Sequence, residues 1–196
     1  LSHAEGFSIR YFQNYKEVVV FNPFSHNAVY QRYYLVRDTD VSVPADGLKI
    51  KIPVRSLAAT SVTHFEFLNL LHVIDAVTGV CSSKIIYSPQ INERLNKGLI
   101  VDLGDAFNIN LEKTVQLHPD LVMVIGYNQN DPFAQRLLQA GIFPVYNNEW
   151  MEKSLLGRAE WIKFVAAFFD KEKFADSIYR EVEQEYKKTA DRAKVV

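Results

Sequence analysis

The alternation of apolar and polar positions is clearest between residues 108 and 126, where it predicts a short helix followed directly by a buried strand. Asn110 can cap the helix, because its side-chain oxygen can accept a backbone N–H of the first turn. Glu112 then places a negative charge at the positive end of the helix dipole. Pro119 has no N–H, so the helix ends before it. The unbroken apolar run 121–125 is typical of a parallel strand that is covered on both faces.

Strand and helix patterns alternate over residues 53–150 and predict a doubly wound α/β lobe with a mostly parallel sheet. Thr63 and Glu66 have the spacing of a capping box at the start of one helix. The expected apolar side of that helix consists of Phe67, Leu70, Leu71 and Ile74. The expected strands cover 56–60, 77–81, 99–103, 121–125 and 143–146, and further helices cover 89–96 and 131–140. Pro144 places the last strand at an edge of the sheet.

A β-rich segment precedes this lobe and a helical segment follows it. Alternating strands at 7–11, 17–21, 30–37 and 48–52 predict a β-meander extension over residues 6–52. Residues 151–196 are expected to form two helices, the second from about 171 to 194. Its apolar stripe consists of Phe174, Ile178, Val182 and Tyr186. Such a helix spans about 35 Å, so we expect it to bridge to another part of the protein.

The composition indicates a globular protein and gives no sign of a nucleic-acid partner. Of the 196 residues, 48% are hydrophobic and 23% are charged, which suits a packed core. The 22 basic and 23 acidic residues leave a net charge of −1, so no basic excess would attract nucleic acid or an anionic membrane. Aromatic residues make up 13% of the chain. A β-rich core is a better explanation for them than a ligand surface.

The single cysteine, Cys81, cannot form an internal disulfide, and its apolar neighbours predict an inert, buried thiol. No apolar run approaches the ~20 residues of a membrane span. Residues 1–10 do not form a basic-then-apolar signal segment. If the protein is exported, we therefore expect its targeting peptide to have been removed.

The motifs of several enzyme classes are missing. The loop at residues 60–64 lacks the glycines of a dinucleotide-binding turn, and the sequence contains no P-loop. No nucleophile elbow or Ser-His-Asp order occurs with usable spacing. One histidine, His64, is expected where a strand meets a helix, and one histidine does not make a metal site. We therefore expect no catalysis, no resident cofactor and no metal centre.

Several short motifs follow one another in a fixed order. They are Ser-x-Thr-His at 61–64, Gly-Val-Cys-Ser at 79–82, Asp-Leu-Gly at 102–104, Asn-Leu-Glu at 110–112, Pro-Asp-Leu-Val at 119–122 and Leu-Gly-Arg-Ala-Glu-Trp at 156–161. Together they resemble the class III periplasmic binding proteins that deliver cobalamin, ferric siderophores or haem to ABC importers. The resemblance runs from about Val54 to Ala193. The aromatic segment before Val54 resembles an extension of Bacteroides-type members.

The resemblance implies two α/β lobes joined by a rigid helix, of which this chain would hold the N-terminal lobe and the linking helix. The ligand would rest on the loops at the carboxyl ends of the strands. The residues expected to contact it are Ser61, Thr63, His64, Ser82, Ser83, Gly104, Asp105, Tyr127 and Asn128. His64 could face the ligand or ligate haem, although a helix-capping or solvent-facing histidine is the favoured interpretation.

Glu112 matches the family glutamate that docks on arginines of the membrane permease. The alternative is a surface carboxylate that only complements the helix dipole, and the two roles are compatible.

The function implied by the resemblance is a non-catalytic receptor. It would capture an iron–siderophore, haem or cobalamin-type ligand in the periplasm and deliver it to an ABC permease in the inner membrane. A lipid anchor on a removed N-terminal segment would hold it there. The main alternative is an α/β chelatase- or nitrogenase-like enzyme subunit, which shares the lobe architecture. In a third hypothesis the aromatic β-segment binds a partner protein.

Overall fold

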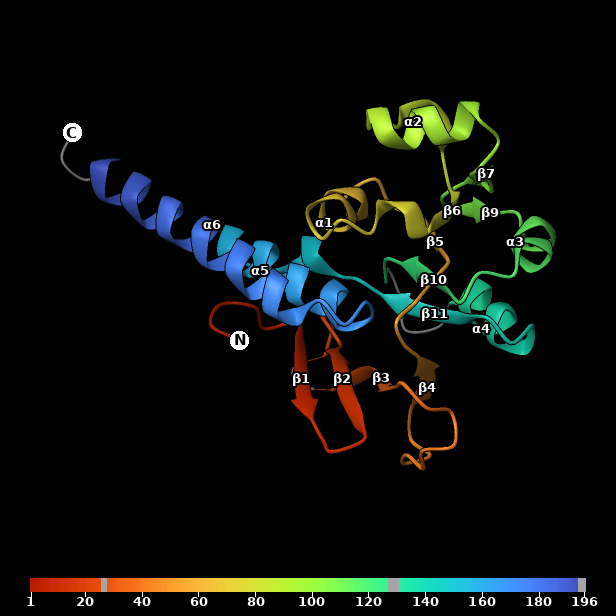
Figure 1. The fold of residues 1–196 in the computed structure, drawn as a ribbon, viewed down its shortest axis with the longest axis horizontal. Coiled ribbons are helices and arrows are strands. Elements are labelled where there is room, and N and C mark those ends of the chain that lie inside the picture. Colours follow the sequence, from red (N-terminus) through yellow and green to blue (C-terminus); the bar gives the residue numbers. More distant parts are fainter. Residues whose placement is uncertain (26–27, 127–130, 194–196) are drawn as a thin grey trace.

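The computed structural model describes residues 1–25, 28–126 and 131–193. Figure 1 shows a four-stranded sheet near a five-stranded sheet and a long helix that extends from the body. The strands are β1 (Phe7–Tyr11), β2 (Tyr15–Phe21), β3 (Val29–Val36), β4 (Leu48–Lys51), β5 (Leu57–Ala59), β6 (Val77–Val80), β7 (Val101–Asp102), β8 (Gly104–Asp105), β9 (Asn108–Ile109), β10 (Leu121–Val124) and β11 (Phe143–Tyr146). The α-helices are α1 (His64–Leu70), α2 (Pro89–Asn96), α3 (Leu111–Leu117), α4 (Pro132–Gln139), α5 (Leu155–Ala167) and α6 (Glu172–Ala193), and the 3-10 helices are η1 (Ile74–Ala76), η2 (Ser83–Ile85) and η3 (Glu149–Met151).

The five-stranded sheet forms the lobe that the strand–helix alternation predicts. Its order is β11-β10-β5-β6-β7, and every neighbouring pair in it is parallel. Helices α3 and α4 pack against each other on one face, and α1 packs with α5 on the other (Figure 1). The prediction of a doubly wound α/β lobe is therefore confirmed.

The order of the strands creates a topological switch point between β5 and β10. From β5, the chain first adds β6 and β7 on one side and later adds β10 and β11 on the other. Because all five strands are parallel, the loops that follow them leave from one edge of the sheet. Open α/β sheets bind ligands at this edge, in the crevice at the switch point.

The segment between residues 108 and 126 folds as expected. Asn110 caps α3, since its Oδ1 accepts the backbone N–H of Lys113 at 2.9 Å. The helix ends at His118, which adopts a left-handed conformation (φ 47°) directly before Pro119. β10 is buried along its whole length between β5 and β11.

Helix α1 differs from its prediction at both ends. Thr63 has helical backbone angles (φ −66°, ψ −23°) and makes no side-chain capping bond, so the expected capping box with Glu66 is wrong. A capping side chain reaches the first-turn N–H groups from an extended backbone. After the helix, His72 takes a φ of 53°, which places Ile74 in η1, while Leu70 is exposed. The residues buried here are His64, Phe65, Leu68 and Leu71.

The N-terminal sheet, with the order β1-β2-β3-β4, contains the expected hairpin but is not a β-meander. β1 and β2 are antiparallel, as are β2 and β3, whereas β3 and β4 are parallel. The chain must therefore return to the start of β3 before β4 begins. Gly47 permits this close return, because a Cβ there would lie 2.8 Å from the carbonyl oxygen of Arg32.

Tyr33, on β3, joins the two sheets. Its buried hydroxyl donates to the carbonyl oxygen of Pro144 (3.3 Å) and accepts the N–H of Tyr146 (2.9 Å). β11 is an edge strand of its sheet, as Pro144 predicts, and Tyr33 satisfies part of that open edge. One apolar core consequently runs from the extension into the lobe.

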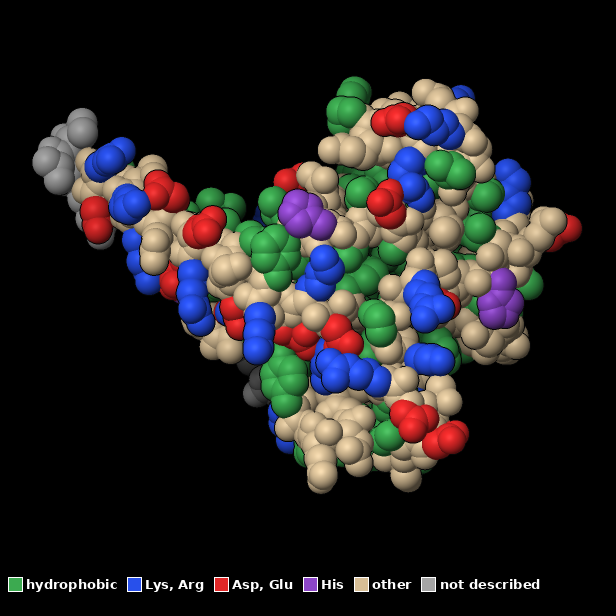
Figure 2. All heavy atoms as spheres, viewed as in Figure 1, with side chains coloured by type: hydrophobic (Ala, Val, Ile, Leu, Met, Phe, Trp, Pro, Cys, Tyr) green, Lys and Arg blue, Asp and Glu red, His purple; other side chains and the backbone are tan. Residues whose placement is uncertain are grey.

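Helix α6 is long, as expected, but it packs through a different side. The residues that it buries are Ala175 and Tyr179, and it lies against α5. Most of the predicted stripe is exposed, with Phe174, Val182 and Tyr186 between 38% and 45% accessible. Its 22 residues span roughly 33 Å. Acidic and basic side chains alternate along its outer part (Figure 2).

Candidate functional site

A hollow of about 300 Å³ lies at the switch point between β5 and β10, and we call it the switch-point hollow. It is lined by Thr60, Ala106, Phe107, Ile109, Val124, Ile125, Asp131 and Phe133. These residues come from the ends of β5 and β10, the β8–β9 hairpin and the start of α4. A mainly apolar lining with a few polar groups is typical of a small-molecule site.

The β8–β9 hairpin forms one wall of this hollow and carries Phe107, which is 80% exposed. Gly104 has a φ of 94°, and the carboxylate of Asp105 accepts the N–H of Phe107 at 2.8 Å. Ser82 holds the hairpin in place. Its N–H donates to the Gly104 carbonyl (2.7 Å), and its Oγ accepts the N–H of Ala106 (3.2 Å).

The structure therefore brings four predicted contact residues together: Ser82, Ser83, Gly104 and Asp105. The hydroxyl of Ser83 donates to the carboxylate of Asp102 (2.5 Å). Ser61 and Thr63 lie on the neighbouring loop, after β5, with their hydroxyl oxygens 2.9 Å apart. All six residues lie in loops that leave the carboxyl edge of the sheet.

Other residues singled out in the sequence lie elsewhere. Tyr127 and Asn128 fall outside the described residues. Glu112 is exposed in the first turn of α3, close to the same edge. Cys81 is buried just after β6, and burial raises its pKa to about 12. It is the inert core thiol that its neighbours in the sequence predict.

His64 is not at the surface of this edge, so neither a ligand-facing nor a solvent-facing histidine is correct. Its side chain is completely buried, and its Nε2 lies 3.8 Å from Oε2 of Glu149. Burial lowers the pKa of His64 to about 4. The ring is therefore neutral at neutral pH and packs in the core beneath the loop that contains Thr63.

His64 belongs to a buried polar cluster with the segment that follows β11. Asn147, Asn148 and Glu149 are also buried, and burial raises the pKa of Glu149. Asn148 accepts the N–H of Gly126 at 2.7 Å. Several atoms of the cluster make no hydrogen bond within the described part of the chain: both ring nitrogens of His64, Oδ1 of Asn147, Nδ2 of Asn148 and Oε2 of Glu149. The cluster lies between the start of α1, directly after the loop that follows β5, and the segment that follows β11.

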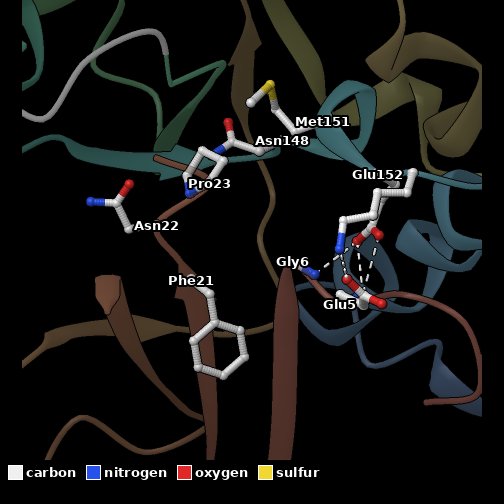
Figure 3. A pocket seen from close by; sticks show the side chains of 9 residues that line it. Glu5, Gly6, Phe21, Asn22, Pro23, Asn148, Met151 and Glu152 are labelled. Carbon is white, nitrogen blue, oxygen red and sulfur yellow. Dashed lines mark hydrogen bonds and ion pairs between the residues drawn. The ribbon is translucent and has the colours of Figure 1, made fainter. Parts of the chain in front are cut away.

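A second hollow, of about 170 Å³, lies where the N-terminal segment meets η3 (Figure 3). Its main polar group is the carboxylate of Glu152, which accepts the N–H groups of Glu5 and Gly6 and the indole N–H of Trp161. This carboxylate is already occupied by protein donors. The second hollow therefore reflects a structural junction more than a ligand site.

Sequence reasoning did not single out Thr60, Phe107 or Asp131, although all three line the switch-point hollow. Thr60 and Asp131 become neighbours because β10 pairs with β5, and Phe107 joins them on the β8–β9 hairpin that Ser82 holds. The local sequence carries no signal for either contact.

Two kinds of site are absent from the residues that the structure describes. No three His, Cys, Asp or Glu side chains gather there as metal ligands. None of the described helices is both long and apolar enough to cross a membrane.

The model of the periplasmic binding protein family matches residues 57–195. The match begins at β5 and includes the parallel sheet, the switch-point hollow and α6. The chain therefore belongs to the periplasmic binding protein family, as the order of its motifs predicts. Proteins of this family bind solutes and are not enzymes.

Among curated proteins, two uncharacterized lipoproteins of Methanocaldococcus jannaschii are similar to this chain. One is 27% identical over 217 residues, which cover 99% of this chain and 52% of the relative. The other is 29% identical and covers 64% of this chain and 33% of the relative. This chain thus spans about half the length of the first relative, and the alignment with it includes the N-terminal extension.

Solved structures with the same fold are substrate-binding proteins. The triscatecholate siderophore binding protein FeuA from Bacillus subtilis has a TM-score of 0.58 at 19% identity, covering 78% of this chain and 50% of FeuA. Staphylococcus aureus SirA, solved with staphyloferrin B, has a TM-score of 0.56 at 17% identity, and the match covers 74% of this chain and 47% of SirA. A periplasmic solute binding protein from Veillonella parvula has a TM-score of 0.57 at 19% identity, and the match covers 70% of this chain and 42% of that protein. At these identities the likeness concerns the fold.

Proposed function

We propose that this chain is the ligand-binding lobe of an ABC importer's substrate-binding protein and that it captures an iron–siderophore, haem or cobalamin-type chelate. The single observation that carries the proposal is the apolar hollow at the switch point of a family-matched parallel sheet. FeuA is a triscatecholate siderophore binding protein and SirA was solved with staphyloferrin B, and both likenesses support this ligand class.

In this proposal the ligand contacts the loops around the hollow. Ser61, Thr63, Ser82 and Ser83 supply hydroxyl groups, and the Gly104–Asp105 hairpin supplies backbone and carboxylate oxygens. Tyr127 and Asn128 are proposed as further contacts. His64 supports the loop after β5 from beneath, because its buried ring has no path to a ligand.

Glu112 and a lipid anchor would bring the protein to its permease at the membrane. Glu112, exposed in the first turn of α3, docks on cationic residues of the permease. The protein works on the outer side of the cytoplasmic membrane, held by a lipid anchor on a segment that precedes this chain. The lipoprotein names of the M. jannaschii relatives support the anchor.

The test is a titration of the full-length protein with cyanocobalamin, hemin and ferric siderophores, in which calorimetry measures binding. We expect saturable one-to-one binding of at least one of them. Phe107→Asp should weaken it at least about tenfold, because the variant removes a large exposed apolar ring from the wall of the hollow. Leu99→Asp is the matched control, since Leu99 is also exposed but precedes β7, at the opposite edge of the sheet. Absence of binding to every chelate, or equal loss in both variants, would contradict the proposal.

A further inference from the structure

The fixed charge at the switch-point hollow is negative. Asp131 is the charged residue among those that line it, and Asp105 lies exposed on the adjoining hairpin. Each carboxylate is held in place by a backbone N–H of its own loop. Asp131 accepts from Phe133 at 2.9 Å and Asp105 from Phe107 at 2.8 Å. Both charges therefore stay at this edge.

Three basic side chains from elements around the lobe do not line the hollow. Lys113 donates to the carbonyl oxygen of Asp102 (3.2 Å), and Arg158 donates to that of Glu152 (3.4 Å). Lys84 is exposed within η2, after β6, and does not line the hollow. Along the described parts of the lining, no basic residue is present to balance Asp131.

Large apolar side chains are exposed around the same edge. Phe107 is 80% and Tyr87 90% accessible, and Val62 and Ile85 are exposed as well. They come from the loops that follow β5, β6 and β7. Val62, Ile85 and Tyr87 line one hollow, and Phe107 lines the switch-point hollow. Exposed apolar side chains on loops at a ligand-binding edge indicate a surface that a partner molecule covers.

From this charge pattern we propose that the chelate taken at this edge is electroneutral or cationic and presents an apolar face, as a corrinoid or a ferric trihydroxamate does. This inference rests on the proposed function and narrows its ligand class. Phe107 and Tyr87 would pack on the apolar face of the chelate.

The physical reason is the cost of placing like charges together where water is excluded. A ferric tricatecholate or tricarboxylate complex is strongly anionic, and Asp105 and Asp131 would repel it at short range. A neutral or cationic chelate meets no such repulsion. It also gains from covering the exposed apolar side chains.

The first test compares probes of different charge on the full-length protein. Ferrioxamine B is cationic, cyanocobalamin and ferrichrome are neutral, and ferric enterobactin and ferric citrate are anionic. We expect at least one cationic or neutral probe to bind at least about tenfold more tightly than either anionic probe. Tightest binding of an anionic probe would overturn this inference and leave the proposed function standing. Failure of these five probes and of hemin to bind would overturn both.

The second test changes the charges without changing the loops. Asp105→Asn and Asp131→Asn, combined, should keep the side-chain oxygens that accept the two N–H groups. We expect ferrioxamine B to bind about threefold to tenfold more weakly at low salt, neutral probes to be unchanged, and the difference to shrink at high salt. The matched control is Asp75→Asn, an exposed residue of η1 that precedes β6. An unchanged affinity for ferrioxamine B in the double variant would contradict the inference.

Discussion

At the scale of single residues, the least expected feature is the buried pair of His64 and Glu149. The imidazole makes no hydrogen bond with the described residues and lies 3.8 Å from a carboxylate that is itself buried. A buried group of this kind is stabilised in its neutral form, because burial penalises the charged imidazolium. Lowering the pH therefore lowers the free energy of unfolding, because the folded state disfavours protonation of His64.

The first residue-scale prediction concerns the pH dependence of stability. The pKa of His64 is lowered from 6.5 to about 4 in the folded protein. Between these two pH values, His64 is protonated in the unfolded chain but neutral in the folded protein. Stability falls as the pH drops from about 6.5 towards about 4, and by roughly 3 kcal/mol in total. His64→Leu should lack this loss, which urea unfolding at a series of pH values would measure.

The matched control is His72→Asn, which removes an exposed imidazole at a position with a φ of 53°. Asn tolerates this left-handed conformation, so the variant tests whether a change in the pH slope is specific to the buried imidazole. The comparison uses the slope with pH, and a cavity left by His64→Leu does not affect it. A slope unchanged by His64→Leu would show that His64 is accessible to protons in the folded state.

At the scale of elements, two carboxylates hold the N-terminal segment against α5. The carboxylate of Glu160 accepts the backbone N–H groups of Ser2, His3 and Ala4 at 2.8–3.0 Å. Glu152 does the same for the next two residues, as Figure 3 shows. This arrangement starts β1 in the correct place and ties the extension to the lobe.

Burial would raise the pKa of Glu160, but the N–H groups of Ala4, His3 and Ser2 and the ammonium of Lys163 outweigh it and lower the pKa to about 2. The stability from this carboxylate is present above its unfolded value of 4.5 and disappears as the pH falls towards about 2. Glu160→Gln should therefore cost roughly 1–3 kcal/mol at neutral pH and progressively less below about pH 4.5.

Chemical unfolding at several pH values would measure this difference. Glu185→Gln is the control, because Glu185 is an exposed glutamate of α6 that pairs only with Lys188 among the described ion pairs. Its effect should stay within about 0.5 kcal/mol. If Glu160→Gln were as mild as the control, the carboxylate would not hold the segment.

At the scale of the whole molecule, helix α6 leaves one apolar side exposed, where another part of the protein could pack. The side of α6 that carries Phe174, Val182 and Tyr186 is exposed, and the helix extends beyond the body (Figure 1). The chain spans 52% of the length of the first M. jannaschii relative. As in the two-lobed proteins that the sequence resembles, we propose that a second lobe packs near this helix and closes the switch-point hollow from the other side.

The prediction at this scale concerns docking to the permease. Glu112→Gln should leave ligand affinity unchanged and weaken the complex of the full-length protein with its permease by about twofold to fivefold, the usual worth of one exposed ion pair. Both affinities can be measured with the permease in nanodiscs. Glu66→Gln is the control, because Glu66 also lies in the first turn of a helix and loses the same dipole interaction. Equal weakening by both variants would remove docking as the role of Glu112.

The sequence by itself determined the elements whose signals are local. The Asn110 cap, the stop at Pro119 and the apolar run of β10 predicted a helix–strand pair, and the repeated pattern predicted the parallel sheet. These features follow from neighbours in the chain: a cap needs a nearby N–H, a proline lacks one, and a strand buried on both faces must be apolar throughout.

Only the tertiary structure decided which elements became neighbours. It placed His64 in the core, paired β4 parallel to β3, and brought Thr60, Phe107 and Asp131 together at one hollow. Contacts of this kind join residues far apart in the chain, and they form because burying apolar surface favours one packing of the whole molecule over the others. The spacing of residues along the chain does not record that choice. The sequence therefore predicted the edge of the sheet where the candidate site lies, but not the residues that line its hollow.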